Sequence, residues 1–205
     1  MTGRTSAIDG VTIEQWRPGA DADIDMLADV LHAVVHDGAG VSFIVPFTMA
    51  EARRFWVDKV VPGVREGTRH VLVARDGKRI VGTVQFELAW PPNQPHRAEV
   101  AKLLVHPVAR RRGVGRALML ALESLARAEG RTLLTLDTWT GGHAESLYRS
   151  LGYVVVGVIP RFARGSTTAA LEPTTIMYKE LVGTVPREWG QSPPNGKRGT
   201  VPKER

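Results

Sequence analysis

The chain has 205 residues, which is enough for one domain with a substantial apolar core. Hydrophobic residues make up 43% and charged residues 23%, as in ordinary globular proteins, which argues against a fibrous or wholly disordered chain. The absence of cysteine excludes disulfides, thiolate zinc sites and a cysteine acyl-enzyme. No apolar run can span a bilayer, and residues 1–10 lack the apolar segment of a secretory signal, so we expect a cytoplasmic protein without membrane contact.

The formal charge of +6 raises the question of a nucleic-acid partner. Half of this excess comes from residues 183–205, where five basic residues face two acidic ones. We expect no nucleic-acid partner, because neither a recognition helix nor aromatic residues interleaved with the arginines are visible. Three segments are predicted: a disordered N-terminus at 1–10, one domain at 11–182 and a disordered basic tail at 183–205.

The first half of the chain predicts helices between strands. The expected elements are a strand at 11–16, a helix at 24–35, a helix from 48 to about 64, and strands at 70–74 and 80–90. Asp21 or Asp23 is the expected N-cap of the first helix. Thr48 and Glu51 form the pattern of a capping box for the second. The Asp76-Gly77 pair is typical of a tight hairpin turn between the last two strands.

The second half predicts four strands and two helices. The expected elements are strands at 97–105, 133–137, 153–158 and 174–181, and helices at 113–129 and 144–151. A helical crossover joins the strands at 97–105 and 133–137, so these two strands should be parallel. Hairpins imply antiparallel pairing elsewhere. The pattern therefore indicates an α/β (α+β) domain with a mixed sheet of about seven strands and helices on both faces.

The segment 99–117, EVAKLLVHPVARRRGVGRA, carries the most informative pattern. An apolar strand runs into a basic turn that contains Arg110, Arg111, Arg112 and Gly113, and an amphipathic helix follows. Unpaired N–H groups and the positive end of the helix dipole make such a turn an anion site, and guanidinium groups match phosphates. Walker and Rossmann patterns do not match. The alternative is a basic helix start that binds no ligand.

A second motif lies about thirty residues downstream, where residues 144–153 read AESLYRSLGY. Together with the R-x-x-G-x-G turn and the order of elements, this A-x-x-L-Y-x-x-x-G-[FY] segment resembles the Gcn5-related N-acetyltransferase (GNAT) superfamily. The resemblance covers about residues 11–182. Within the superfamily, the RAEVxKL and LDT segments are most similar to the tabtoxin-resistance type, which acetylates a small-molecule amine.

The resemblance implies acetyl-CoA as the cofactor, bound in a wedge where two parallel strands splay apart. The backbone of Leu103, Leu104 and Val105 would pair with the pantetheine arm. The amides implied for the pyrophosphate are those of Arg111, Arg112, Gly113, Val114, Gly115, Arg116 and Ala117. Many members carry an asparagine seven residues before the motif tyrosine. Here that position is Gly141, so one side-chain contact to the cofactor is missing.

Glu99 is the leading candidate for a general base. Strict alternation along the strand places on one face Glu99, Ala101, Leu103 and Val105. Four residues span roughly 13 Å, so a proton would pass from substrate to Glu99 through one or two waters. In histone-acetylating members of the family the matching position is a glutamate base. The alternative is an edge glutamate paired with Arg97 or Lys102.

Asp137 and Tyr148 are the other catalytic candidates. Asp137 ends the neighbouring parallel strand, where functional side chains gather, and would take a proton or hold the substrate ammonium. Its alternative role is to cap the turn that follows. Tyr148 lies in the second motif and would donate a hydrogen bond beside the cofactor's sulfur, whereas its alternative role is helix packing.

The acceptor side is less clearly marked. The apolar segment 41–47 is expected either to line the acceptor pocket or to pack into the core. Arg161 and Arg164, between the last two strands, are candidates to meet a substrate carboxylate. His32 and His36 have metal-ligand spacing without a third ligand, so we expect no metal.

We expect an N-acetyltransferase that moves an acetyl group from acetyl-CoA directly to a primary amine of a small molecule. An acceptor with both an amine and an acid, such as an amino-acid-like antibiotic or toxin, would match the candidate acidic residues and arginines, and would imply a role in resistance. The alternatives are a protein lysine or N-terminal acetyltransferase and a non-catalytic acyl-CoA sensor. A homodimer is expected by analogy with the superfamily alone.

Overall fold

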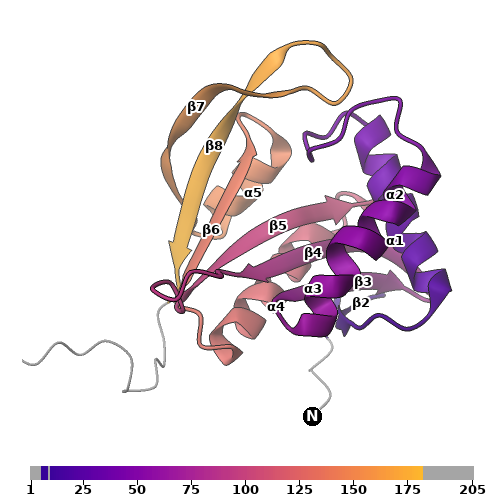
Figure 1. The fold of residues 1–205 in the computed structure, drawn as a ribbon, viewed down its shortest axis with the longest axis horizontal. Coiled ribbons are helices and arrows are strands. Elements are labelled where there is room, and N and C mark those ends of the chain that lie inside the picture. Colours follow the sequence, from indigo (N-terminus) through magenta and orange to yellow (C-terminus); the bar gives the residue numbers. More distant parts are fainter. Residues whose placement is uncertain (1–5, 9, 182–205) are drawn as a thin grey trace, which may run out of the picture.

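A mixed eight-stranded sheet organises the domain (Figure 1). The computed structural model describes residues 6–8 and 10–181. The strands lie in the order β1-β2-β3-β4-β5-β6-β8-β7. Their bounds are β1 Ser6–Ile8, β2 Val11–Trp16, β3 Arg69–Asp76, β4 Arg79–Leu88, β5 Arg97–Val105, β6 Leu133–Trp139, β7 Val154–Arg164 and β8 Leu171–Glu180.

Helices cover both faces of this sheet. Their bounds are α1 Asp21–His36, α2 Met49–Phe55, the π-helical segment η1 Trp56–Val60, α3 Val61–Glu66, the 3-10 turn η2 Pro107–Ala109, α4 Val114–Ala128 and α5 His143–Ser150. Apolar side chains of α4 and α5 bury one face, and those of α1, α2 and η1 bury the other. The predicted α/β (α+β) class, with helices on both faces, is confirmed. Among the described helices, none combines the length and apolar character that a membrane span requires.

The predicted parallel pair is confirmed, because β5 and β6 run parallel and every other neighbouring pair is antiparallel. The predicted count of about seven strands missed β1, which lies within the segment expected to be disordered. This strand pairs with β2 over Ser6–Ile8. The tail predicted at 183–205 lies outside the described residues.

Of the two helix caps predicted from the sequence, one is present in the structure. The capping box is confirmed: the Glu51 N–H donates to Thr48 Oγ1 at 3.2 Å, and the Thr48 N–H donates to Glu51 Oε2 at 2.7 Å. The predicted cap of α1 is wrong, since its N-cap is Ala20, without a side-chain bond. Asp23 instead accepts from the Arg75 guanidinium at 2.7 Å, an ion pair that competes with capping.

Candidate functional site

The parallel strands β5 and β6 separate halfway along their length. They pair only over Arg97–Leu133, Ala98–Leu134 and Glu99–Thr135, although β5 continues to Val105 and β6 to Trp139. Figure 1 shows the two strands diverging from there. The sheet is therefore opened between β5 and β6 at their carboxyl ends, where α/β proteins place their ligands.

A β-bulge in β5 redirects the side chains at this opening. Thr83 of β4 pairs with Leu104, and Gln85 pairs with Ala101, so Lys102 and Leu103 together oppose a single residue. Lys102 has a φ of 50°, a left-handed conformation that is uncommon for a lysine. A bulge of this kind shifts the alternation of the strand by one residue.

The shared face predicted for Glu99, Ala101, Leu103 and Val105 is therefore wrong. Glu99 and Ala101 lie on the face that α1, α2 and η1 cover, together with the buried Leu104. Leu103 and Val105 pack instead against the core under α4 and α5. Uninterrupted alternation does not hold because the bulge adds one residue to β5.

Two acidic side chains from neighbouring strands share the face of Glu99. Glu87 of β4 is its direct cross-strand partner, and Asp137 lies two residues beyond Thr135, the partner of Glu99 on β6. Burial and the nearby Glu87 carboxylate raise the pKa of Glu99 above its usual value. The Glu99 carboxylate is 3.9 Å from the Arg97 guanidinium, so the predicted pairing with Arg97 is present but loose.

Asp137 is held by the neighbouring strand rather than by the following turn. Its Oδ2 accepts a hydrogen bond from Thr174 Oγ1 of β8 at 3.0 Å. The helix that follows, α5, has Gly142 as its N-cap without a side-chain bond, and the Gly141 N–H donates to Glu145 Oε2 at 2.7 Å. The alternative role of Asp137 as a turn cap is therefore not realised, and its carboxylate is exposed.

Tyr148 lies on the opposite side of the opening, in α5. Its side chain is buried, at 5% exposure, and its ring lies 5.5 Å from the ring of Tyr153. Burial and, to a smaller extent, the charge of Asp137 raise the pKa of Tyr148. Its phenol thus stays protonated over the whole ordinary pH range and can donate a hydrogen bond.

The turn before α4 has the geometry expected of an anion site. Gly113 is the N-cap, with a φ of 76°, and α4 has no side-chain cap. The first amides of the helix, from Val114 onward, therefore lack intrahelical acceptors. A Cβ at Gly115 would lie 3.3 Å from Leu147 Cδ2, so the backbone here packs closely against α5.

Three arginines at this turn and in the first turn of α4 have carboxylate or hydroxyl partners. The Arg110 guanidinium donates to Asp37 at the end of α1, and the Arg112 guanidinium donates to Asp76 at 2.7 Å. Arg116 donates to Ser150 Oγ at 2.7 Å. These contacts engage the guanidinium groups, whereas the first amides of α4 have no intrahelical acceptors. The phosphate site stays a prediction.

The acceptor side was only partly foreseen. Of the two roles expected for the segment 41–47, packing into the core is confirmed by the buried Phe47. The segment also lines a groove of about 500 Å³ with α2 and η1, but none of Glu99, Asp137 and Lys102 lines this groove, so the role in an acceptor pocket stays a prediction. The Val45 N–H donates to Ser166 O at 2.9 Å, which joins the segment to the β7–β8 connection. Arg161 and Arg164 are exposed residues of β7 rather than of a connecting loop. His36 Nδ1 lies 2.9 Å from His32 O.

Sequence reasoning missed two residues of the site. Glu87 has no motif around it, and only strand pairing places it opposite Glu99. Lys102 had been considered only as an ion-pair partner of Glu99. Its Nζ instead donates to Ser42 Oγ at 3.3 Å, which the bulge makes possible.

Comparisons with known proteins agree with this geometry. Residues 35–153 match the sequence model of the acetyltransferase (GNAT) family. An N-acetyltransferase encoded in the hisH-hisA intergenic region of Azospirillum brasilense is 32% identical over 129 residues, which cover 62% of this chain and 74% of that protein. The mycothiol acetyltransferase of Streptomyces scabiei is 39% identical over 108 residues, or 51% of this chain. The match spans only 32% of that longer protein.

A solved structure shares the fold. An acetyltransferase from Salmonella typhimurium, determined with its cofactor acetyl-CoA, superposes with a TM-score of 0.67. The match covers 89% of this chain and 100% of that one, at 19% identity. At this identity the likeness concerns the fold alone.

Proposed function

The chain belongs to the acetyltransferase (GNAT) family, and we propose that it transfers an acetyl group from acetyl-CoA directly to a primary amine of a small molecule. Acetyl-CoA is the cofactor that membership in the family implies. The observation that carries the proposal is the end of β5–β6 pairing after Glu99–Thr135, with carboxylates on one side of the opening and a phenol on the other.

The residues at the opening suit coenzyme A. A pyrophosphate needs several backbone amides in a close approach, and the uncapped start of α4 offers them beside Gly113 and Gly115. The free edge of β5 beyond Glu99 offers the backbone of Leu103, Leu104 and Val105 to the pantetheine arm. When bound, acetyl-CoA supplies an acetyl group activated as a thioester.

The side chains of this chain would prepare the acceptor. The carboxylates of Glu99 and Asp137 bind the acceptor ammonium, and Glu99, whose pKa is raised by burial and by Glu87, is the better placed of the two to take its proton. On the other side of the opening, Tyr148 Oη holds a proton that it donates in a hydrogen bond. This division gives a base and a hydrogen-bond donor on opposite sides of the sheet.

A small acceptor is favoured over a protein segment. The connection between α1 and α2 joins the β7–β8 connection through the Val45 N–H to Ser166 O bond and through Ser166 Oγ, which donates to Ala39 O. This bridge closes one end of the acceptor face, whereas a peptide acceptor needs a groove open at both ends. Within this class of small acceptors we propose an amino-acid-like antibiotic or toxin, and hence a role of the enzyme in resistance.

The proposal is tested by two measurements. Acetyl-CoA should raise the melting temperature of the protein, whereas a DNA duplex should not. A thiol-release assay with a panel of primary amines should then detect turnover, which Glu99→Gln and Asp137→Asn reduce while cofactor binding persists. Stabilisation by acetyl-CoA without turnover on any amine would favour an acyl-CoA sensor, and turnover on peptides alone would favour a protein acetyltransferase. The homodimer and the cytoplasmic location stay predictions.

A further inference from the structure

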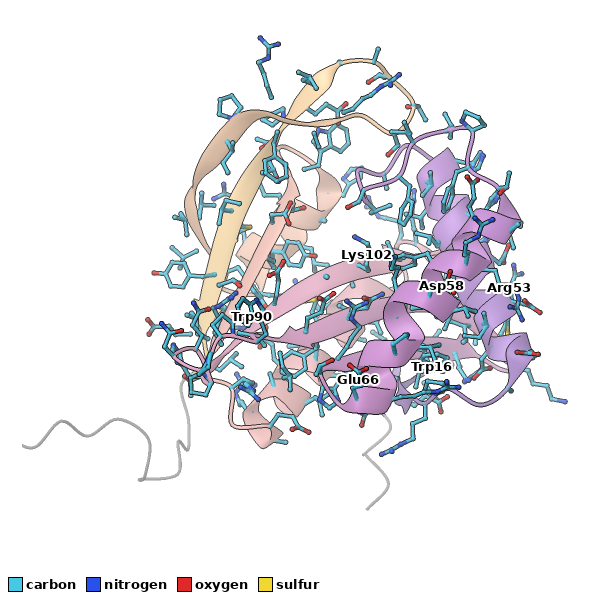
Figure 2. The ribbon with its side chains drawn as sticks, in the orientation of Figure 1. Trp16, Arg53, Asp58, Glu66, Trp90 and Lys102 are labelled. Carbon is cyan, nitrogen blue, oxygen red and sulfur yellow. The ribbon has the colours of Figure 1, made fainter. Side chains whose placement is uncertain are left out.

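Lys102 is an unusual residue at the acceptor face. Ala98 and Val100 point into the apolar core under α4, and in a regular strand Lys102, two residues further on, would do the same. The bulge and its left-handed φ turn it to the other face, where its Nζ reaches Ser42 in the connection after α1. Figure 2 shows Lys102 between β5 and that connection. Non-glycine residues with such conformations are costly and often mark functional sites.

The Lys102 ammonium has a hydroxyl as its partner where an anion would be expected. Its hydrogen bond goes to Ser42 Oγ at 3.3 Å, and no carboxylate of the described residues lies within 4 Å of it. Nearby carboxylates are already paired: Glu87 lies 3.0 Å from the Arg69 guanidinium, and Asp137 accepts from Thr174. Burial lowers the pKa of Lys102, while Glu87 and Asp137 act in the opposite sense. A partly buried cation whose partner is neutral gains most from an anionic ligand group.

Gln85 is a second unusual polar side chain on this face. It is fully buried on the same face, opposite Ala101 and one position from Glu87 in the alternation of β4. Neither its amide nitrogen nor its amide oxygen has a partner among the described residues. Buried amides are almost always satisfied, and both atoms of this amide are closed off from the surface, so an enclosed water is the expected partner of Gln85.

We propose that Lys102 binds the carboxylate of a zwitterionic, amino-acid-like acceptor whose amine faces Glu99 and Asp137. Arg69 and Arg97 are already paired with Glu87 and Glu99, whereas the partner of Lys102 is a hydroxyl group. A ligand that carries both charges suits this arrangement, because its ammonium meets the acids and its carboxylate meets Lys102. A phosphate dianion would be repelled more strongly by the same acids. This inference rests on the proposed acetyl transfer and assigns the carboxylate contact to Lys102 instead of Arg161 and Arg164.

Matched acceptor pairs that differ only in the carboxylate test the inference. We would compare L-phenylalanine with phenethylamine, L-lysine with cadaverine, and L-serine with ethanolamine and phosphoethanolamine. Lys102→Met keeps the length of the side chain and removes its charge. This variant should raise KM for the amino acids by roughly 10- to 100-fold, which is the loss expected for a charged hydrogen bond. The KM values of the amines should change by no more than about twofold. Lys78→Met, on the exposed β3–β4 turn, is the control.

Binding supplies a second readout. Calorimetry with protein saturated with CoA should give tighter binding of each amino acid than of its amine, and Lys102→Met should abolish the difference. The inference would be overturned if Lys102→Met lost the same affinity for both members of a pair. It would also be overturned if the protein bound no amino acid, or bound phosphoethanolamine more tightly than L-serine. If the amines are acetylated and the amino acids are not, the proposed function stands and only the role of Lys102 fails. If no amine is acetylated, the proposed function itself fails.

Discussion

Glu99 and Glu87 lie directly opposite each other across the β4–β5 pair, on the face of the sheet that α1, α2 and η1 cover. Two carboxylates in such a cross-strand pair repel each other, which is unfavourable for the fold. The arrangement persists because Arg69 lies 3.0 Å from Glu87 and Arg97 lies 3.9 Å from Glu99. Burial, the larger cause, and this pair together raise the pKa of Glu99, so it binds a proton more readily than an ordinary glutamate.

This repulsion predicts the pH dependence of turnover. Burial and Glu87 raise the pKa of Glu99, so kcat should fall with decreasing pH at a higher pH than for an unperturbed glutamate base. Glu87→Gln removes the repulsion and leaves the Arg69 charge, and both effects lower the pKa of Glu99. The acidic limb of the kcat profile should therefore move to lower pH. Glu66→Gln, exposed on α3, makes the same change in net charge and should not move the limb.

Two neighbouring tyrosines should respond differently to loss of their hydroxyl groups. Tyr148→Phe removes the proposed hydrogen-bond donor and should lower kcat about 100-fold with little change in acetyl-CoA affinity. Tyr153, whose ring is 5.5 Å away, has a buried hydroxyl without a partner among the described residues. Tyr153→Phe should therefore leave kcat unchanged and keep or slightly raise the melting temperature. Equal kcat values for the two variants would remove the role of Tyr148.

The start of α4 is tested by a pair of glycine substitutions. Gly113 and Gly77 both have positive φ angles, of 76° and 58°. Alanine at either position should cost about 1–2 kcal/mol of stability through backbone strain. Only at Gly113 does this strain fall on the N-cap of α4, whose first amides are proposed to bind the pyrophosphate. The new Cβ would lie 2.8 Å from Ile8 Cδ1, the end of a side chain that can shift. Calorimetry should find weaker acetyl-CoA binding for Gly113→Ala and wild-type binding for Gly77→Ala; identical affinities would argue against this phosphate site.

Glu145, in α5, should contribute to the stability of the domain in a pH-dependent way. The Gly141 N–H and the Arg149 guanidinium lower the pKa of its buried carboxyl group. Its stabilising contribution is therefore fully present above the unfolded pKa of about 4.3 and is lost as the pH falls through the lower folded value. Glu145→Gln should cost roughly 1–3 kcal/mol in urea unfolding at pH 7.

The cost of Glu145→Gln should also depend on pH. It should shrink progressively in more acidic solution, because the wild-type carboxyl group then becomes protonated and loses the same contacts. Glu66→Gln again serves as the control, since its side chain is exposed. A cost that is independent of pH would show that the carboxylate charge of Glu145 contributes nothing.

Most of the fold was predictable because its signals are local. The capping box at Thr48 and Glu51, the turn at Gly77 and the crossover helix each reflect interactions within a few residues, and they fix the order of the elements. The short strand β1 was missed because three residues carry no periodicity of their own. Its stability comes from pairing with β2.

The site was less predictable, because it depends on pairing between distant strands. The motif around Tyr148 marks its helix, but Glu87 joins Glu99 only through the register of β4 and β5. The bulge at Lys102 follows no composition rule, since no glycine marks it, and it reverses the faces of all later residues in β5. Periodicity assigns a face only where a strand is uninterrupted.

The central claim is direct acetyl transfer to a small primary amine, and mass spectrometry of the reaction with acetyl-CoA and the amine panel tests it most directly. We expect one N-acetylated amine for each CoA released, and an unmodified protein mass throughout turnover. Acetyl-CoA that stays intact in the presence of every amine, or an acetyl group that accumulates covalently on the protein before the amine is added, would contradict the account.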